Sequence, residues 1–299
     1  MASRADRRIL MTGTPAPHSP LDLYGQMRII EPEWKPRTVD VFKDRYALYE
    51  NEHVPQQITG WQNLNDLQRR IAPYKYSITL DEVLDIPVGY DSTVNISLSL
   101  SGRKAYNELR EDYVTQVAQG EISTFNVLTR TLRLQQLTSG VLDVEGKRYR
   151  VDDAKPQALL RLLQEGEPEP TVVFARFKAD LDVIHWAAEE AGLGSAELSG
   201  RAKDLETWQD SSGRPYVLAA QIQAGGLGVN MTRAARCIFY STGYGAGDYW
   251  QCRARVRRAG QTRETYFTHL VAKNTIDEIA LKAIRDRTSV AKALLREIK

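Results

Sequence analysis

The hydrophobic pattern of residues 155–299 alternates between helical periodicity and short apolar runs. Continuous apolar runs of four to six residues, separated by helical stretches such as 178–191, are typical of parallel strands that helices cover on both faces. Residues 155–299 therefore predict an α/β fold with a parallel sheet. The expected strands are 171–174, 216–220, 236–240 and 265–270.

Residues 86–154 show a different pattern. Val94, Ile96, Leu98 and Leu100 alternate with polar residues, as in a half-buried strand over 90–100. Apolar positions then recur at three- and four-residue steps, which predicts helices. The elements expected after the strand are helices at 101–118 and 123–138 and a hairpin at 141–151.

The first 85 residues are less regular. A short strand is expected at 8–15, ending in a Gly and Pro turn, and an amphipathic helix at 21–30. The stretch 31–101 is rich in Pro and aromatic residues, with helical spacing around Leu67. We therefore expect a mainly helical, irregular insertion in this part of the chain.

Composition narrows the class of protein. The 299 residues carry 40 Lys and Arg against 38 Asp and Glu, a net charge of +2, so any affinity for nucleic acid must come from local patches. Cys237 and Cys252 are too few for a disulfide framework, which predicts a reducing, cytoplasmic setting, with nucleoid or nucleus also possible. No apolar run approaches the roughly 18 residues of a membrane span, so no membrane partner is expected.

The most informative block is residues 251–261, QCRARVRRAGQ. Together with Arg263 it holds five arginines and no acidic residue. Arginine provides planar, bidentate contacts to phosphate and can neutralise charge on a transferred phosphoryl group. In a helix, Arg255 and Arg258 would lie on one face. A solvated basic helix face is the alternative for a charge run taken alone.

A second block, QAGGLGVNMT at 223–232, follows an apolar strand and opens a helix-like segment. Exposed backbone N–H groups in such a turn can bind phosphate or sugar. The block matches neither the GxxxxGK[ST] phosphate loop nor the GxGxxG dinucleotide fingerprint, and a plain tight turn is the alternative.

Taken in order, four segments resemble the later motifs of superfamily-two helicases: MTGTP at 11–15, TVVFARF at 171–177, AGGLGVNMT at 224–232 and the arginine block. The sequence is most similar to the Swi/Snf-type DNA translocases. The likeness includes PLDLY at 20–24, DIP at 85–87, LQQLTSG at 134–140 and Lys155.

The resemblance implies a RecA-like parallel sheet flanked by helices. It implies three regions: 1–85, the end of a first motor lobe with an irregular helical insertion; 86–154, a strand and helical protrusion; and 155–299, the second RecA-like lobe. In this family two lobes close over ATP and Mg²⁺ while the motor moves on double-stranded DNA.

By similarity, Arg255 and Arg258 are catalytic arginine fingers that reach the γ-phosphate of ATP. The resemblance also implies ATP-binding roles for Gln251, Gly226, Gly228 and Gln261. The DNA-binding or coupling residues that it implies are Thr12, Gly13, Thr14, Arg176, Gln223, Gly225 and Asn230.

Some positions depart from the family pattern. Ala254 stands where aspartate is common, Arg257 where histidine is common, and His18 where asparagine often follows the Gly-Thr-Pro turn. Lys75 is the one basic residue in 73–77, where the family has more. These differences concern how ATP hydrolysis is coupled to movement on DNA, and they do not concern the fold.

The 299 residues hold neither a phosphate loop nor an Asp-Glu-x-His box, so they lack the groups that cradle the β-phosphate and hold Mg²⁺. We therefore expect ATP hydrolysis only when a first lobe completes the site, supplied by a second polypeptide or by the rest of a longer protein. The alternative is a non-catalytic DNA-binding or regulatory module, and the arginine pair argues against it. A Rossmann-type enzyme of unrelated chemistry lacks its fingerprint.

The histidines, tryptophans and acidic pairs considered next are not expected to form functional sites. His53, His185 and His269 lack metal-ligand spacing. Tryptophans 186, 208 and 250 sit beside apolar positions, which favours packing over base stacking. The acidic pairs 152–153 and 189–190 are expected in solvent.

Overall fold

The computed structural model describes residues 5, 7–13, 15–16, 19–49, 58–78, 82, 84–118, 124–144, 147–210, 212–225, 228–243 and 245–285. The chain divides into two compact units, residues 1–83 and 84–299. Each unit has its own hydrophobic core.

The first unit is small and mainly helical. Its helices are α1 (Pro20–Ile30), α2 (Val39–Tyr46) and α3 (Leu64–Ile71), followed by the 3₁₀ turn η2 (Ala72–Tyr74). Strands β1 (Ala47–Tyr49) and β2 (Ile58–Trp61) pair antiparallel. The core is largely aromatic, with Trp34, Phe42 and Tyr46 buried together. The stretch predicted as irregular therefore packs into a compact cluster.

The strand predicted at 8–15 was wrong. Residues 8–12 adopt no regular structure, and Ile9 and Met11 are 85% and 94% exposed. No strand among the described residues pairs with this segment. Its apolar side chains therefore gain no burial from a pleated arrangement.

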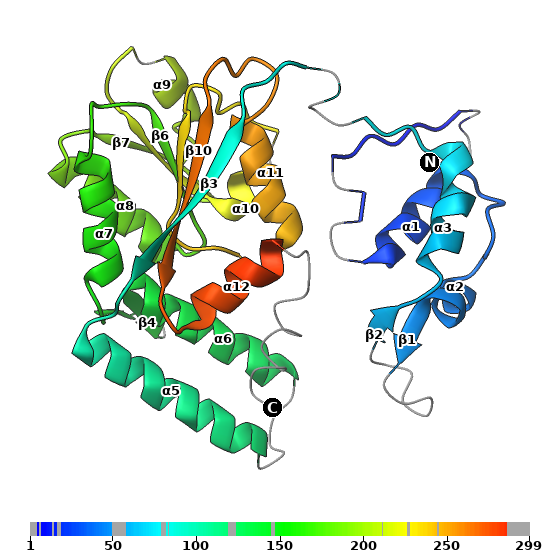
Figure 1. Cartoon of the computed structure of the whole chain (residues 1–299), viewed down its shortest axis with the longest axis horizontal. Helices are drawn as coiled ribbons and strands as arrows, with labels where there is room; N and C mark the ends of the chain where they lie inside the picture. Colours follow the sequence, from blue (N-terminus) through cyan, green and yellow to red (C-terminus); the bar gives the residue numbers. More distant parts are fainter. Residues whose placement is uncertain are drawn as a thin grey trace. The chain divides into compact units, whose positions relative to one another are not determined.

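The second unit is built on a parallel sheet of six strands in the order β3-β10-β9-β6-β8-β7 (Figure 1). All neighbouring strands in it are parallel, which confirms the predicted α/β, RecA-like class. The strands are β3 (Gly89–Ile96), β6 (Thr171–Ala175), β7 (Ser195–Leu198), β8 (Val217–Gln221), β9 (Arg236–Phe239) and β10 (Thr265–Ala272).

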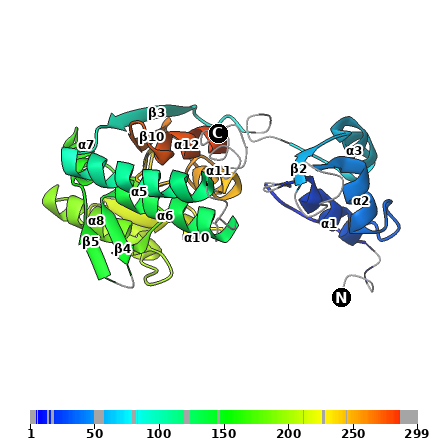
Figure 2. The same ribbon diagram turned by 90° about the horizontal axis from the view of Figure 1, so that it is seen from below.

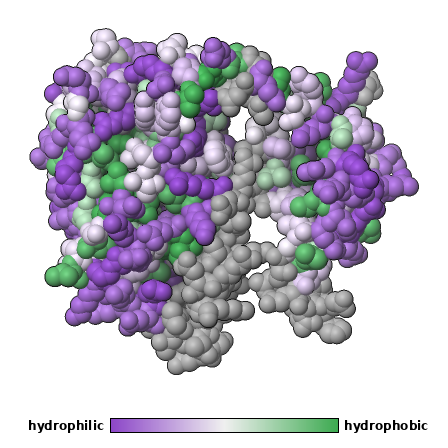
Figure 3. Space-filling model, in the orientation of Figure 1, coloured by the Kyte–Doolittle hydropathy of each residue, from purple (hydrophilic) through white to green (hydrophobic). Residues whose placement is uncertain are grey.

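Helices cover both faces of this sheet. One face packs on α7 (Ala154–Gln164) and α8 (Lys178–Glu190) through residues such as Val173. The other packs on α9 (Leu205–Asp210), α10 (Ile222–Gly225) and α11 (Ala246–Val256) through residues such as Phe174. Burial on both faces explains the continuous apolar runs of the central strands. Hydrophilic side chains cover most of the coloured surface (Figure 3).

A helical protrusion follows β3. Helices α5 (Leu100–Ala118) and α6 (Thr124–Ser139) pack together near α12 (Ile276–Arg285), as Figure 2 shows. Strands β4 (Val141–Val144) and β5 (Lys147–Arg150) pair antiparallel, as expected for a hairpin at 141–151, and residues 145–146 lie outside the described residues. The protrusion therefore lies within the second unit.

Asp152 fixes the base of this protrusion. The carboxylate accepts hydrogen bonds from Ser99 N at 2.8 Å and from Ala154 N at 2.7 Å, so it links the starts of α5 and α7. A Cβ at Gly102 would lie 2.0 Å from an Asp152 oxygen. The expectation that Asp152 is solvated was wrong, because the residue is 4% exposed. Glu189 and Glu190 are exposed as expected.

Candidate functional site

The structure brings two of the predicted motifs together. Met231 N donates to the carbonyl oxygen of Arg255 at 2.9 Å. Arg258 Nη1 donates to Val229 O at 3.3 Å. The glycine-rich segment 223–232 and the arginine block, called the finger segment (residues 251–261) below, are therefore held against each other by one backbone and one side-chain hydrogen bond.

Helix α11 carries the first part of the finger segment. Tyr249, Cys252 and Val256 form its apolar stripe and are buried against the sheet. Gln251 and Arg255 are half-buried and lie four residues apart, so they share a side of the helix.

The finger segment is helical only as far as Val256. Arg257 is the C-cap, with extended backbone, and Gly260 takes a left-handed φ of +95° in the following turn. Arg258 thus lies in the turn rather than on the helix. The expectation that Arg255 and Arg258 share one helical face is corrected accordingly.

Gln261 fastens the turn to its surroundings. The side chain is 5% exposed, and its Nε2 donates to Ala234 O at 2.8 Å and to the carbonyl oxygens of Thr232 and Val256, each at 3.3 Å. Its Oε1 accepts from Arg263 N at 3.1 Å. These contacts give Gln261 a role in positioning the segment.

The five arginines of the block do not have the same surroundings. Arg253 forms an ion pair with Asp91, with 2.9 Å between Nη2 and Oδ2, and its guanidinium lies 3.9 Å from the ring centroid of Phe267. Arg257 donates to Pro87 O at 3.0 Å, and Arg263 donates to Arg233 O. Arg255 and Arg258 remain half-buried beside the glycine-rich segment.

A chain of hydrogen bonds continues from Arg253 into the sheet. Arg253 Nη1 donates to Tyr249 OH at 3.0 Å, and Tyr249 OH lies 2.9 Å from Nε2 of His269. His269 Nδ1 lies 3.1 Å from Ser92 O, so this nitrogen carries the proton and the hydroxyl of Tyr249 donates to Nε2. Burial lowers the pKa of His269 to about 4, which keeps the ring neutral near pH 7.

The charge state of the Asp91 carboxylate is set by its partner Arg253. Burial alone would raise its pKa, but the hydrogen bonds and charge of Arg253 outweigh burial and lower it. Asp91 is therefore ionised at neutral pH, and the pair with Arg253 ties α11 to β3.

The glycine-rich segment runs from the carboxyl end of β8 to the amino end of β9. Gln223 is exposed on α10, which ends at Gly225, and Gly228 is exposed with a left-handed φ of +72°. The Asn230 side chain accepts from Thr232 N at 3.0 Å, which closes a turn. Gly226 lies outside the described residues.

Arg176 directly follows β6, at the carboxyl edge of the sheet. Its Nη1 donates to Gln135 Oε1 of α6 at 2.7 Å, and its backbone N donates to Ser241 Oγ at 2.8 Å. The finger segment instead ends near the amino ends of β3 and β9, where Arg253 meets Asp91. The predicted residues of the second unit thus form two groups, which the glycine-rich segment connects.

Thr12 and Gly13 belong to the first unit and are exposed. Thr14 lies outside the described residues. Lys75 is exposed in the first unit and His18 is not described.

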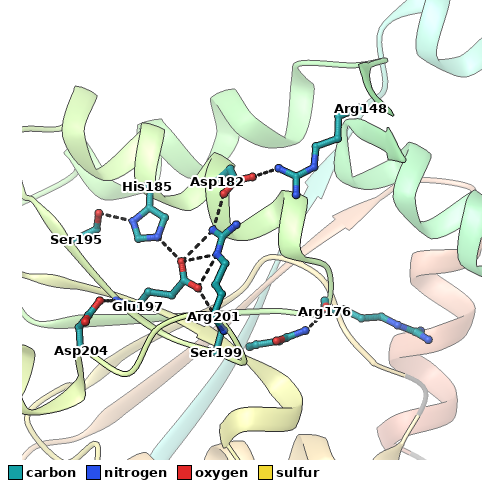
Figure 4. A network of polar contacts seen from close by, with 10 residues as sticks. Arg148, Arg176, Asp182, His185, Ser195, Glu197, Ser199, Arg201 and Asp204 are labelled. Atoms are coloured by element: carbon teal, nitrogen blue, oxygen red, sulfur yellow. Dashed lines mark hydrogen bonds and ion pairs between the residues drawn. The ribbon is translucent and has the colours of Figure 1, made fainter. Parts of the chain in front are cut away.

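Sequence analysis missed a polar network on α8 and β7 (Figure 4). His185 Nε2 lies 2.8 Å from Glu197 Oε2, and Arg201 Nε donates to both Glu197 oxygens at 2.8 and 3.1 Å. Asp182 forms ion pairs with both Arg201 and Arg148 of β5. The partners come from separate elements, so no local pattern could have indicated the network.

The Glu197 carboxylate at the centre of this network stays charged. Burial would raise its pKa, but hydrogen bonds from Arg201, Ser199 and His185 lower it to about 2. The network ties β7 and its following loop to α8. The three tryptophans also pack as predicted: Trp208 is fully buried, while Trp186 and Trp250 lie partly buried against the two cores.

Among the described residues, no group of His, Cys, Asp or Glu is arranged to hold a metal ion. The described part of the chain contains no helix with the length and apolar character of a membrane span.

Residues 154–260 match the family model of the helicase conserved C-terminal domain. The match covers both the glycine-rich segment and nearly all of the finger segment. Residues 154–260 are therefore the C-terminal lobe of a Swi/Snf-type helicase of superfamily two.

Relatives of this Swi/Snf-type chain include putative protein p41 of Acyrthosiphon pisum secondary endosymbiont phage 1, which is 25% identical over 98% of the chain and 65% of its own length. An uncharacterized ATP-dependent helicase of Mycoplasma pneumoniae is 24% identical over 97% of the chain and 28% of its own length. The DNA repair and recombination protein RAD26 of Saccharomyces cerevisiae is 24% identical over 92% of the chain and 28% of its own length.

The fold of this Swi/Snf-type chain resembles a solved structure, the SWI2/SNF2 ATPase core of Sulfolobus solfataricus in complex with dsDNA. The TM-score is 0.54 at 19% identity, over 92% of this chain and 59% of that chain. The chain thus spans between about a quarter and two thirds of the relatives described here.

Proposed function

We propose that this chain is the C-terminal half of an ATP-dependent translocase on double-stranded DNA, with Arg255 and Arg258 as arginine fingers. The observation that carries the proposal is the junction of the two motifs at Met231 and Arg255. A segment suited to contact DNA and a segment suited to contact ATP are joined there by direct hydrogen bonds.

The arginine environments support the choice of fingers. Arg253, Arg257 and Arg263 are engaged with Asp91, Pro87 and Arg233. Arg255 and Arg258 lie on either side of the helix end. The backbone carbonyl of Arg255 accepts from Met231 N, and the Arg258 guanidinium donates to Val229 O. A guanidinium fixed before the reaction stabilises negative charge on the transferred γ-phosphoryl group without reorganisation.

The donor set fits ATP better than it fits Mg²⁺. Guanidinium groups and backbone amides bind phosphate oxygens, whereas the sequence has no phosphate loop or acidic box. Gln251, Gly226 and Gly228 would border the nucleotide, and Gln261 would hold the finger segment in place. Bound Mg²⁺ would neutralise phosphate charge, and a first lobe outside these 299 residues would hold it.

DNA contacts are proposed at the carboxyl edge of the sheet and along the glycine-rich segment that leaves it. Arg176, Gln223, Gly225 and Asn230 would meet backbone phosphates without reading bases, which gives binding that depends on salt rather than on sequence. The Thr12-Gly13-Thr14 turn would couple hydrolysis to movement of the lobes.

ATP hydrolysis by the purified chain tests the proposal, measured with and without double-stranded DNA and with an added first-lobe polypeptide from a related helicase. We expect turnover only after mixing, and its loss in Arg255→Ala and Arg258→Ala but not in Arg263→Ala. Turnover by the chain alone would contradict the need for a first lobe. DNA binding without turnover in any mixture would favour the non-catalytic module.

A further inference from the structure

We propose that residues 84–91, called the connecting segment below, are a tether that transmits movement of the first unit to the arginine fingers. This inference rests on the proposed function. The connecting segment is where the chain enters the second unit. It is therefore the covalent route by which residues 1–83 can pull on the lobe that carries Arg255 and Arg258.

Arg257 binds the first half of the connecting segment. Its Nε donates to Pro87 O at 3.0 Å and its Nη2 to Ile86 O at 3.4 Å. One guanidinium thus spans two successive carbonyl groups. This position departs from the family pattern, in which histidine is common. An imidazole has no fork of donors with which to span two carbonyls.

The backbone at Gly89, beside this contact, is closely packed. A Cβ at Gly89 would lie 3.1 Å from Arg257 Cδ and 3.1 Å from Thr265 Oγ1. Thr265 N also donates to Val88 O at 3.0 Å. The connecting segment is therefore held between Arg257 on one side and the start of β10 on the other.

Arg253 binds the second half of the connecting segment through its ion pair with Asp91. Arg253 and Arg257 are separated by one turn of α11, and the amide of Arg257 bonds to the carbonyl of Arg253 at 2.9 Å. Arg255 lies between these two contacts in sequence, and Arg258 follows the second. A displacement of the connecting segment would therefore shift α11 and its end as one body.

Hydrogen exchange in the purified chain tests the physical link without ATP or DNA. Arg257→Ala should speed exchange of the amides at 86–91 by about 10-fold or more, and Asp91→Asn should speed exchange at Met231 and Gln261 similarly. The matched control Arg263→Ala removes the same charge and a backbone contact away from the tether, so the amides at 86–91 should not change. Effects of Arg257→Ala and Asp91→Asn confined to their own sites would overturn the link.

Turnover with an added first lobe tests the functional consequence. Arg257→Ala should lower kcat at least about fivefold with little change in the KM for ATP, and Arg257→Lys should recover part of the loss. Two glycines inserted between Leu84 and Asp85 should lower kcat while leaving exchange at 86–91 unchanged. Wild-type kcat in both variants would overturn the tether, whereas wild-type kcat in Arg255→Ala would overturn the proposed function instead.

Discussion

The backbone amide of Met231 donates a 2.9 Å hydrogen bond to the carbonyl oxygen of Arg255. This contact joins the end of the glycine-rich segment to the last turn of α11. Because the other end of the glycine-rich segment leaves the carboxyl edge of the sheet after β8, the segment spans the lobe between the proposed DNA contacts and the proposed fingers. Five predictions test how this arrangement is stabilised and used.

Gln261→Ala should lower the free energy of unfolding by about 1–3 kcal/mol, because it removes the donor that three carbonyl groups share and leaves Ala234 O without it. Urea denaturation measures the change. Gln164→Ala, at an exposed position of α7, is the control and should stay within about 0.5 kcal/mol of wild type. Equal stabilities for both variants would contradict the role of Gln261 in holding the turn in place.

His269 predicts acid sensitivity. Burial lowers its pKa to about 4 from the ordinary value of 6.5, so the neutral ring stabilises the fold fully above pH 6.5, and this contribution is lost as pH falls towards 4. The loss should reach about 3 kcal/mol. Denaturation curves of wild type and His269→Gln, measured between pH 7 and pH 4, should show a smaller pH dependence in the variant. The same pH dependence in both proteins would contradict the assignment.

Lys155 and Asp277 form a buried ion pair with 2.6 Å between Nζ and Oδ2, joining α7 to α12. Lys155→Met should cost about 3–5 kcal/mol, because it leaves the Asp277 carboxylate buried without its cation. The double variant Lys155→Met, Asp277→Asn should recover part of that loss in thermal or chemical unfolding. A single variant within about 1 kcal/mol of wild type would show that the pair is unimportant.

Arg176→Ala should weaken binding to double-stranded DNA of any sequence. It should also lower the slope of log Kd against log salt concentration by about 1, because one phosphate contact is lost. Fluorescence anisotropy with two unrelated duplexes at several salt concentrations measures both effects. The control, Arg236→Ala, removes an arginine that donates to Leu162 O at the end of α7. An equal loss in both variants would mean that net charge, not Arg176, determines affinity.

Much of the fold could be predicted from local pattern. The apolar runs gave four central strands because burial on both faces requires them. Strand β7, Ser195–Leu198, was missed because a short edge strand with Ser and Glu lacks such a run. The strand predicted at 8–15 had the right composition but finds no pairing partner among the described residues.

The candidate site was predictable in its motifs and not in its contacts. Spacing alone placed five arginines in one block, but only the fold shows that Arg253 meets Asp91, 162 residues away, and that Arg257 binds the connecting segment. Asp152 was expected in solvent for the same reason, since its partner Ser99 lies 53 residues away. Long-range partners decide the surroundings of each charged residue, and local spacing does not show them.

The most direct test of the central claim compares Arg255→Lys with Arg263→Lys in turnover assays with double-stranded DNA and an added first lobe. Both substitutions keep the charge and remove the guanidinium fork. The account predicts that kcat falls about 100-fold or more in Arg255→Lys, with DNA affinity unchanged, and stays at the wild-type value in Arg263→Lys. Equal kcat values in the two variants would contradict the assignment of Arg255 as an arginine finger.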